Sequence, residues 1–105
     1  MDFSLPPELE EKRKIVRAFA LKEFPEEKRR YYDENEKFPF EIRKKAQEIG
    51  LLNYGNYWDL LITIEELFRV DPGLGFSIFA PFFGNENILL LGNEEQKKKY
   101  FEPVI

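Results

Sequence analysis

Prolines and glycines divide this sequence into short segments whose apolar residues recur at every third or fourth position. Segments of this kind run over residues 6–24, 26–32, 39–49, 57–70, 74–91 and from 93 onward. No window alternates apolar and polar residues for long enough to predict a strand. We therefore expect an all-α fold, a bundle of five or six short helices that makes residues 1–105 a single helical domain.

Residues typical of helix ends mark several of these boundaries. Ser4 is the expected N-cap of the first helix, and Asn56 or Asp59 is the expected N-cap of the helix that starts near residue 57. Asn93 followed three residues later by Gln96 predicts a capping box, in which the two side chains satisfy each other's backbone amides.

Pro81 lies inside the apolar segment 74–91. An interior proline removes a backbone hydrogen bond and costs roughly 3 kcal/mol or more unless the helix bends. We therefore expect a kink or break near Phe79–Pro81, with further flexibility at Gly84.

Three helix faces carry enough apolar side chains to form a core. The first consists of Leu9, Val16, Phe19 and Ala20, the second of Ile42, Ala46 and Ile49 with Leu51 and Leu52, and the third of Leu60, Leu61, Ile64, Leu67 and Phe68. The third face is the broadest, so the helix over 57–70 is expected to be central.

The composition excludes several classes of chemistry. The chain has no cysteine and no histidine, which excludes disulfides, thiolate metal sites, Cys-His and Ser-His nucleophiles and histidine zinc sites. A net charge of −4 and short basic runs beside acids argue against nucleic-acid binding. The N-terminus lacks a signal peptide pattern and no stretch approaches a membrane span, so we expect a cytoplasmic protein with no membrane span.

Two polar groups of residues are candidates for a role beyond solubility. Glu65 and Glu66 are adjacent on a helix, point about 100° apart and cannot form a catalytic pair. We expect them on a solvated flank, with Glu66 spaced to pair with Arg69. Asn85–Asn87 interrupts an apolar segment and is either an exposed loop or a set of polar contacts inside a pocket.

The segment 74–91 is the most aromatic part of the chain, with Phe76, Phe79, Phe82 and Phe83. An aromatic stripe at helical spacing is typical of a core. It is equally a suitable wall for an apolar ligand pocket, since such pockets are lined mainly by apolar side chains. Both interpretations stay open at this point.

Four stretches of the sequence together resemble the N-terminal helical domain of acyl-CoA dehydrogenases. They are the opening Met1–Leu5, Phe38–Pro39 with Ala46–Leu52, the stretch Ile64–Pro72, and the stretch Gly92–Tyr100. The last two are the most specific, and all four occur in the family's order. The loop after Leu52 is shorter than the one usual in the family.

This resemblance implies a share in FAD-dependent α,β-dehydrogenation of acyl-CoA thioesters. The family's flavin site and glutamate base lie in other domains, so it implies no catalytic, cofactor-binding or metal-binding residue here and no cofactor in this chain alone. It implies a wall of the acyl pocket on segment four, with Phe79, Phe82, Phe83 and Asn87 as lining residues. The expected partners are the remaining domains of a flavoenzyme or a self-association partner, with acyl-CoA as a possible ligand.

Two alternatives use the same residues differently. The shortened loop is compatible with a stand-alone or engineered helical module that serves structure or interaction without catalysis. The phenylalanine cluster is compatible with a binding protein for fatty or aromatic ligands. Two observations distinguish these alternatives. One is whether acyl-CoA binds, and the other is whether the phenylalanine-rich surface needs a partner to cover it.

Overall fold

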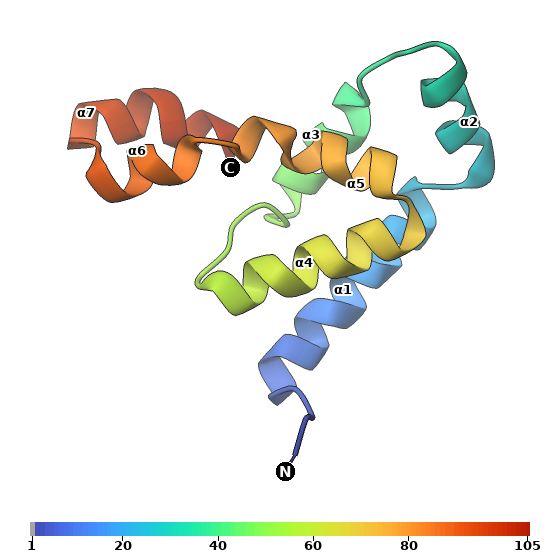
Figure 1. Ribbon diagram of the computed structural model, residues 1–105, viewed down its shortest axis with the longest axis horizontal. Coiled ribbons are helices and arrows are strands. Elements are labelled where there is room, and N and C mark those ends of the chain that lie inside the picture. The colour runs from blue at the N-terminus through green and yellow to red at the C-terminus, as the bar shows by residue number, and fades with distance from the viewer. Residues whose placement is uncertain (1) are drawn as a thin grey trace.

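The computed structural model describes residues 2–105, and this part of the chain is all-α with no strand, as predicted (Figure 1). The α-helices are α1 (Pro7–Glu23), α2 (Glu26–Glu34), α3 (Phe40–Glu48), α4 (Tyr57–Val70), α5 (Pro72–Phe79), α6 (Asn85–Leu91) and α7 (Glu94–Gln96). Short irregular turns complete the chain: 3-10 turns at η1 (Ala80–Phe82) and η3 (Glu102–Val104), and a π-helical turn at η2 (Lys97–Phe101).

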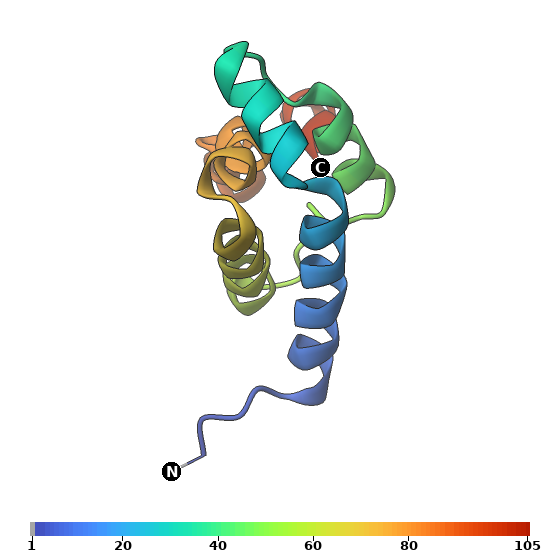
Figure 2. The ribbon, with the colours of Figure 1, turned by 90° about the vertical axis from the view of Figure 1, so that its right-hand side faces the viewer.

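The domain is a flat slab of 43 × 42 × 21 Å. Seen edge-on, α4 and α5 form one side and α1 the other, while the N-terminal segment extends away from the start of α1 (Figure 2). A helix with its side chains is about 10–12 Å across, so the slab is two helices thick. The α6–η2 hairpin projects from one end of this slab (Figure 1).

The core lies between α1, α3, α4 and α5, and the closest pairing of helices is that of α1 with α4. Most residues of the predicted faces of the first and second helices are buried there. The core members are Val16, Phe19, Ala20, Phe24, Ile42, Ala46, Leu51, Leu52, Leu67, Leu74, Ile78, Phe79 and Phe82. Removing these apolar surfaces from water is the main favourable term in the folding of such a domain.

A side-chain cap begins α4, and a shared capping residue separates its end from α5. The Oδ1 atom of Asn56 accepts hydrogen bonds from the amides of Trp58 (2.9 Å) and Asp59 (3.1 Å), which confirms Asn56 as the N-cap. At the other end, Asp71 is both the residue that ends α4 and the N-cap of α5, where its Oδ1 accepts from the Leu74 amide at 2.8 Å. The corner between α4 and α5 is therefore a single residue.

The expected break at Pro81 is present. Helix α5 ends at Phe79, the chain continues through the η1 turn, and Gly84 adopts a positive φ of 91° before α6 begins. A positive φ is readily adopted by glycine because it lacks a Cβ atom. The break turns the chain and directs α6 away from the slab.

The C-terminal hairpin begins with the predicted capping box. The Asn93 Oδ1 atom accepts from the Gln96 amide at 2.8 Å, and the Gln96 Oε1 atom accepts from the Asn93 amide at 3.0 Å. Of the two aromatic residues at the end of η2, Phe101 is buried while Tyr100 is 51% exposed.

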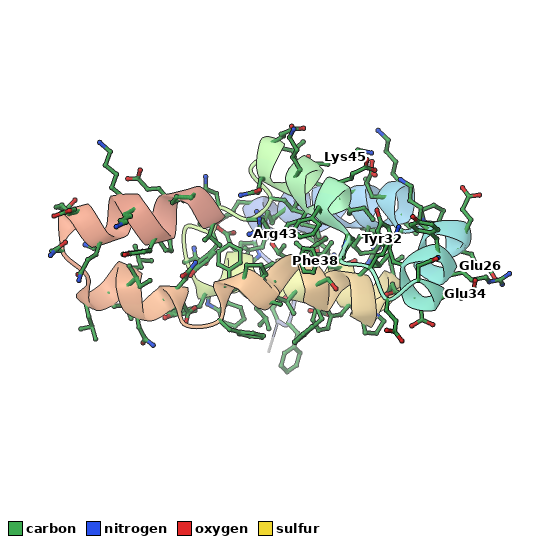
Figure 3. The ribbon with its side chains drawn as sticks, turned by 90° about the horizontal axis from the view of Figure 1, so that it is seen from above. Glu26, Tyr32, Glu34, Phe38, Arg43 and Lys45 are labelled. Carbon is green, nitrogen blue, oxygen red and sulfur yellow. The ribbon has the colours of Figure 1, made fainter. Side chains whose placement is uncertain are left out.

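Helix α3 holds the far end of this hairpin. The Arg43 Nη2 atom donates to the Val104 carbonyl at 2.8 Å, and the Gln47 amide donates to the carbonyls of Pro103 and Val104 at 3.2 Å. Figure 3 shows Arg43 at this junction, beside the place where the hairpin joins the slab. Burial lowers the pKa of Arg43.

Three expectations about helix caps and apolar faces are wrong. Ser4 does not cap α1; its amide donates to Asp2 instead, and Pro6 occupies the N-cap position. Ile49 is 57% exposed because α3 ends at Glu48 and the chain turns there. Leu61 is 51% exposed because α4 turns a neighbouring face, which includes Ile62, towards α1.

The segment Pro72–Leu91 is long and apolar enough to cross a membrane by length and composition, with 20 residues and a mean hydropathy of 1.3. This corrects the expectation that no stretch approaches a span. The segment is not one continuous helix, because it is interrupted by η1 and Gly84. Such interruptions leave backbone groups unpaired, which is unfavourable in lipid, so the segment is weak evidence for a span.

Candidate functional site

An apolar pocket of about 380 Å³ opens between α4 and the α5–α6 segment. We call it the phenylalanine pocket. Its lining residues are Tyr54, Leu60, Ile64, Phe68, Phe76, Phe79, Phe82, Phe83, Gly84 and Glu86. It is within the range of about 300–1,000 Å³ that is typical of small-molecule sites, and its lining is mainly apolar, as in such sites.

Two structural features bring these side chains together. Leu60, Ile64 and Phe68 are four residues apart on α4 and therefore share one face of that helix. Phe82 lies beside Phe79 across the break after α5, with ring centroids 5.6 Å apart. The aromatic wall thus continues through the proline break.

The pocket combines buried and accessible rings. Phe79 and Phe82 are 5% and 7% exposed and belong to the core, whereas Phe83 is 71% exposed at the rim. The Phe76 ring lies 5.6 Å from that of Phe83, and the Tyr54 ring lies 6.2 Å from that of Phe82. The two interpretations of the cluster, core and pocket wall, therefore both apply, to different sides of the same rings.

Three of the four residues expected to line an acyl pocket lie together: Phe79, Phe82 and Phe83. Asn87 does not join them. It is exposed and borders a separate hollow near Tyr100, at the hairpin. That any of these residues contacts an acyl group stays a prediction.

Tyr54 is a lining residue that was not predicted from the sequence, and Glu86 was predicted only within the open alternative for Asn85–Asn87. Glu86 lies on the first turn of α6 and Tyr54 in the loop before α4, and the Tyr54 hydroxyl is 3.5 Å from the Glu86 Oε1 atom. Burial, together with the nearby Glu86 charge, raises the pKa of Tyr54. The signal for Glu86 was its place in an otherwise apolar segment, while nothing local pointed to Tyr54.

The stretch Asn85–Asn87 forms the first turn of α6 and is not a loop. Its three side chains have different surroundings. Asn85 is buried and its Nδ2 atom has no hydrogen-bond partner among residues 2–105, Glu86 lines the phenylalanine pocket, and Asn87 is exposed. The pocket interpretation therefore holds for Glu86 and fails for Asn87.

The expectation that Glu66 lies on a solvated flank is wrong. Its side chain is 1% exposed and faces α1, where its two carboxylate oxygens accept from the Arg17 Nε atom (2.8 Å) and Nη2 atom (3.1 Å). Arg69 is not its partner. The hydrogen bonds and charge of Glu66 raise the pKa of Arg17. This carboxylate is committed to an ion pair and is not available as a catalytic base.

A second buried carboxylate, Glu23, joins three helices. Its Oε2 atom accepts from the Lys45 ammonium of α3 at 2.9 Å and from the Lys28 ammonium of α2 at 3.4 Å. Burial alone would raise the pKa of Glu23, but the two lysines outweigh it and hold that pKa below its ordinary value. Glu23 is therefore a structural anion.

The remaining hollows are less specific. One of about 540 Å³ lies between α2 and α5. Its lining includes both acidic and basic side chains, among them Glu26, Arg29 and Asp33. Two of its lining residues, Glu26 and Tyr32, are labelled in Figure 3. Another, of about 420 Å³, lies between α1 and α3. In the described part of the chain, no group of three acidic, histidine or cysteine side chains is placed to hold a metal ion.

Comparison with known proteins identifies the fold. The family model described as the acyl-CoA dehydrogenase N-terminal domain matches residues 6–105. The chain belongs to this family. Membership of the acyl-CoA dehydrogenase N-terminal domain family confirms the resemblance that the sequence motifs indicated.

Curated relatives agree with this assignment. The chain is 33% identical over 117 residues to a probable medium-chain specific acyl-CoA dehydrogenase of Caenorhabditis briggsae, covering 93% of this chain. It is 33% identical over 119 residues to a short-chain specific acyl-CoA dehydrogenase of Clostridium acetobutylicum, covering 99% of this chain. It is also 31% identical over 104 residues to the CarC subunit of the caffeyl-CoA reductase–Etf complex of Acetobacterium woodii, covering 89% of it.

This acyl-CoA dehydrogenase N-terminal domain corresponds to only part of those relatives, since the matches cover 28%, 30% and 27% of their lengths. The match of 117 residues spans more positions than this chain has in total, so the relative carries residues that this domain lacks. That agrees with a shortened loop without locating it. No solved structure matches the chain.

Proposed function

We propose that this chain is the N-terminal helical domain of an FAD-dependent acyl-CoA dehydrogenase-like enzyme and supplies one wall of its acyl pocket. The observation that carries the proposal is the phenylalanine pocket, in which Phe79, Phe82 and Phe83 converge on one concave apolar surface. Family membership supports the reaction class, and the pocket supports the role within it.

The role of the wall is to remove an acyl chain from water. Each buried methylene contributes about 0.8 kcal/mol, and the rings of Phe76 and Phe83 at the rim are accessible to such a chain. A wall of this kind binds and orients a thioester tail and excludes water from it. It does not itself move a proton or a hydride.

The proposal places FAD outside this domain, because the family's flavin site is expected in other domains. Dinucleotide pyrophosphates are commonly bound by free amides at a helix N-terminus. Here the amides at the start of α4, α5 and α7 are capped by Asn56, Asp71 and Asn93, whereas α1, α2, α3 and α6 begin without a side-chain cap. On the ground of family membership, the proposal assigns the flavin, and catalysis with it, to protein outside this domain and expects the domain to be inactive alone.

Acyl-CoA titration tests the pocket. We expect octanoyl-CoA to bind this chain in a saturable way by isothermal titration calorimetry, and free CoA to bind much more weakly, because the acyl chain fills the phenylalanine pocket. Phe83→Ala removes a rim ring that is 71% exposed and should weaken octanoyl-CoA binding without unfolding the domain. Phe3→Ala, which alters an 85% exposed ring away from the pocket, is the matched control.

The outcomes separate the proposal from its competitors. Equal binding of octanoyl-CoA and CoA, or an equal effect of the two phenylalanine substitutions, would remove the pocket from the proposal. A tightly held, stoichiometric flavin in the purified chain, seen as a yellow colour with flavin absorbance, would contradict the part that expects no cofactor here.

Exposed apolar residues favour a domain that is covered by other protein. Phe83, Leu90 and Leu91 are 71%, 67% and 85% exposed, and all lie between η1 and the end of α6. Large apolar side chains that are exposed within one short segment are typical of interaction sites. We propose the remaining domains of the flavoenzyme as the cover. Light scattering after size exclusion should then show self-association of the isolated chain, whereas a stable monomer favours the stand-alone module.

A further inference from the structure

The phenylalanine pocket contains one carboxylate and no basic side chain. Glu86 is its only lining residue that is charged at neutral pH, and Tyr54 is the only other ionisable one. None of the ion pairs in the described part of the chain involves Glu86. The pocket therefore presents an unbalanced negative charge to whatever occupies it.

The aromatic lining adds to this negative potential. Six aromatic side chains border the pocket: Tyr54, Phe68, Phe76, Phe79, Phe82 and Phe83. The neighbouring ring pairs are tilted by 37°, 50° and 56°, so the rings do not cover each other's faces by parallel stacking. An aromatic face carries negative potential and attracts a cation placed over it.

A purely hydrocarbon ligand leaves one feature of this arrangement unused. A saturated chain would gain from the apolar lining but would offer no partner to the half-buried Glu86 carboxylate. The Tyr54 hydroxyl, at 3.5 Å, is too distant for a strong hydrogen bond. The carboxylate is thus available to pair with a cation or a hydrogen-bond donor on the ligand.

We propose that the pocket recognises a small alkylammonium group, such as a trimethylammonium, at the far end of the ligand's acyl chain. A cation gains from both the Glu86 charge and the aromatic faces, whereas a phenol, which would also pack against the rings, meets the Glu86 charge only through a hydrogen bond. The part of this inference that makes the ligand an acyl-CoA rests on the proposed function. The preference of the pocket for a cation rests on its own side chains.

Two soluble probes of the same shape test this preference. Choline carries a trimethylammonium group, and 3,3-dimethyl-1-butanol carries a neutral tert-butyl group in its place. We expect the full chain to bind choline roughly tenfold more tightly, measured as dissociation constants from NMR titration of the aromatic resonances. The titration should shift resonances of Phe76 and Phe83, whose rings are accessible at the pocket.

Charge substitutions at the pocket and elsewhere provide the controls. Glu86→Gln should bring choline to the affinity of the neutral probe, and Glu86→Asp, which keeps the charge, should retain part of the preference. Glu65→Gln makes the same change in net charge at an exposed position of α4 and should leave the preference intact. Circular dichroism of each variant verifies that the helices persist.

Each outcome supports or overturns the inference. Equal affinity for the two probes in the unmodified chain overturns it, as does an equal effect of Glu65→Gln and Glu86→Gln. Tighter binding of p-cresol than of choline, lost in Glu86→Gln, overturns it in favour of a phenolic ligand.

The acyl-CoA titration keeps the two proposals separate. If octanoyl-CoA binds but choline shows no preference, the cation inference fails and the acyl wall stands. If choline is preferred but octanoyl-CoA and free CoA bind alike, the acyl wall fails and the cation site stands.

Discussion

Arg17 and Glu66 lie 49 residues apart in the sequence and form a two-point ion pair that joins α1 to α4, with distances of 2.8 and 3.1 Å. The two partners are unequally exposed: the Arg17 side chain is 39% exposed, and that of Glu66 is 1% exposed. Arg17 thus reaches from the surface to a carboxylate that is almost completely buried. The pair fixes both the spacing and the rotation of the two longest helices.

Because the two partners are unequally exposed, substituting one should destabilise the domain more than substituting the other. Arg17→Met leaves the carboxylate of Glu66 buried without a partner, while Glu66→Gln leaves an arginine that water can still reach. We expect Glu66→Gln to lower the free energy of unfolding by about 1–2 kcal/mol, and Arg17→Met to lower it further. Urea unfolding followed by circular dichroism measures both. Glu65→Gln, at an exposed neighbouring position, should stay within about 0.5 kcal/mol of the unmodified chain. Equal losses for Arg17→Met and Glu66→Gln would contradict the burial argument.

The Glu23 cluster predicts how stability depends on acid. Because Lys45 and Lys28 hold the pKa of Glu23 below its ordinary value, the folded state binds a proton there less readily than the unfolded chain. The contribution of Glu23 is therefore complete above the ordinary glutamate pKa of about 4.3 and is lost as the pH falls through the lower folded pKa. Urea midpoints measured from neutral pH into this acid range should fall less steeply for Glu23→Gln than for the unmodified chain. Glu27→Gln, an exposed residue on α2, should keep the original slope.

The N-cap of α4 predicts that removing the Asn56 side chain lowers the stability of the domain. Asn56 accepts two backbone hydrogen bonds, and removing such an N-cap typically costs about 1 kcal/mol. We expect Asn56→Ala to lower the free energy of unfolding by that amount and Asn56→Asp to preserve most of it. Asn53→Ala, an exposed asparagine in the same loop, is the control and should have little effect in the same thermal unfolding measurement.

The backbone at Gly84 predicts a cost that does not come from crowding. A Cβ atom added there would meet nothing within 4 Å, so the whole penalty of Gly84→Ala comes from the φ of 91°. We expect a loss of about 1 kcal/mol in thermal unfolding. Gly84→Asn should cost less than Gly84→Val, since asparagine tolerates positive φ better than a β-branched residue. A neutral Gly84→Val would show that the turn can be replaced by another conformation.

The contacts of Arg43 and Gln47 with the last turn predict local rather than global destabilisation. Substituting both by alanine removes the donors to the carbonyls of Pro103 and Val104. Hydrogen exchange measured by mass spectrometry should become faster over residues 94–105 and stay unchanged in α1 and α4. Lys44→Ala, which alters an exposed side chain on the same helix, should not change exchange in either region.

The helical architecture could be predicted from the sequence because its signals are local. Asn56 and Asp71 mark the ends of α4, Asn93 with Gln96 marks the start of α7, and Pro81 marks the break; each acts within four residues of its own position. Such contacts do not depend on how distant segments pack.

The direction that α4 faces could not be predicted in the same way. Apolar residues occur around most of this helix, including Leu61 and Ile62, so helical spacing alone did not decide which side meets α1. The decision depends on Arg17, which is distant in sequence and supplies the charge that lets Glu66 be buried. Without knowledge of Arg17, the sequence pattern of α4 therefore predicts a surface position for Glu66.

Only part of the candidate site could be predicted, because some of its residues are also distant in sequence. Phe79, Phe82 and Phe83 are neighbours in the sequence, so their grouping followed from one segment. Tyr54 lies in the loop before α4 and Glu86 lies on α6, so they meet in the fold although they are 32 residues apart in the sequence. Asn87, one residue further, points elsewhere because successive helix residues differ by about 100° in direction.

The slab is two helices thick, and this has a thermodynamic consequence for the pocket. Phe79 and Phe82 belong to the core and also line the phenylalanine pocket, so the rings that stabilise the fold are the rings that a ligand would touch. A ligand that binds there binds only the folded chain, and its binding free energy adds to the free energy of unfolding. Ligand concentration would therefore set the melting temperature of this domain, and a thermal shift screen would detect its natural ligand before any turnover is measured.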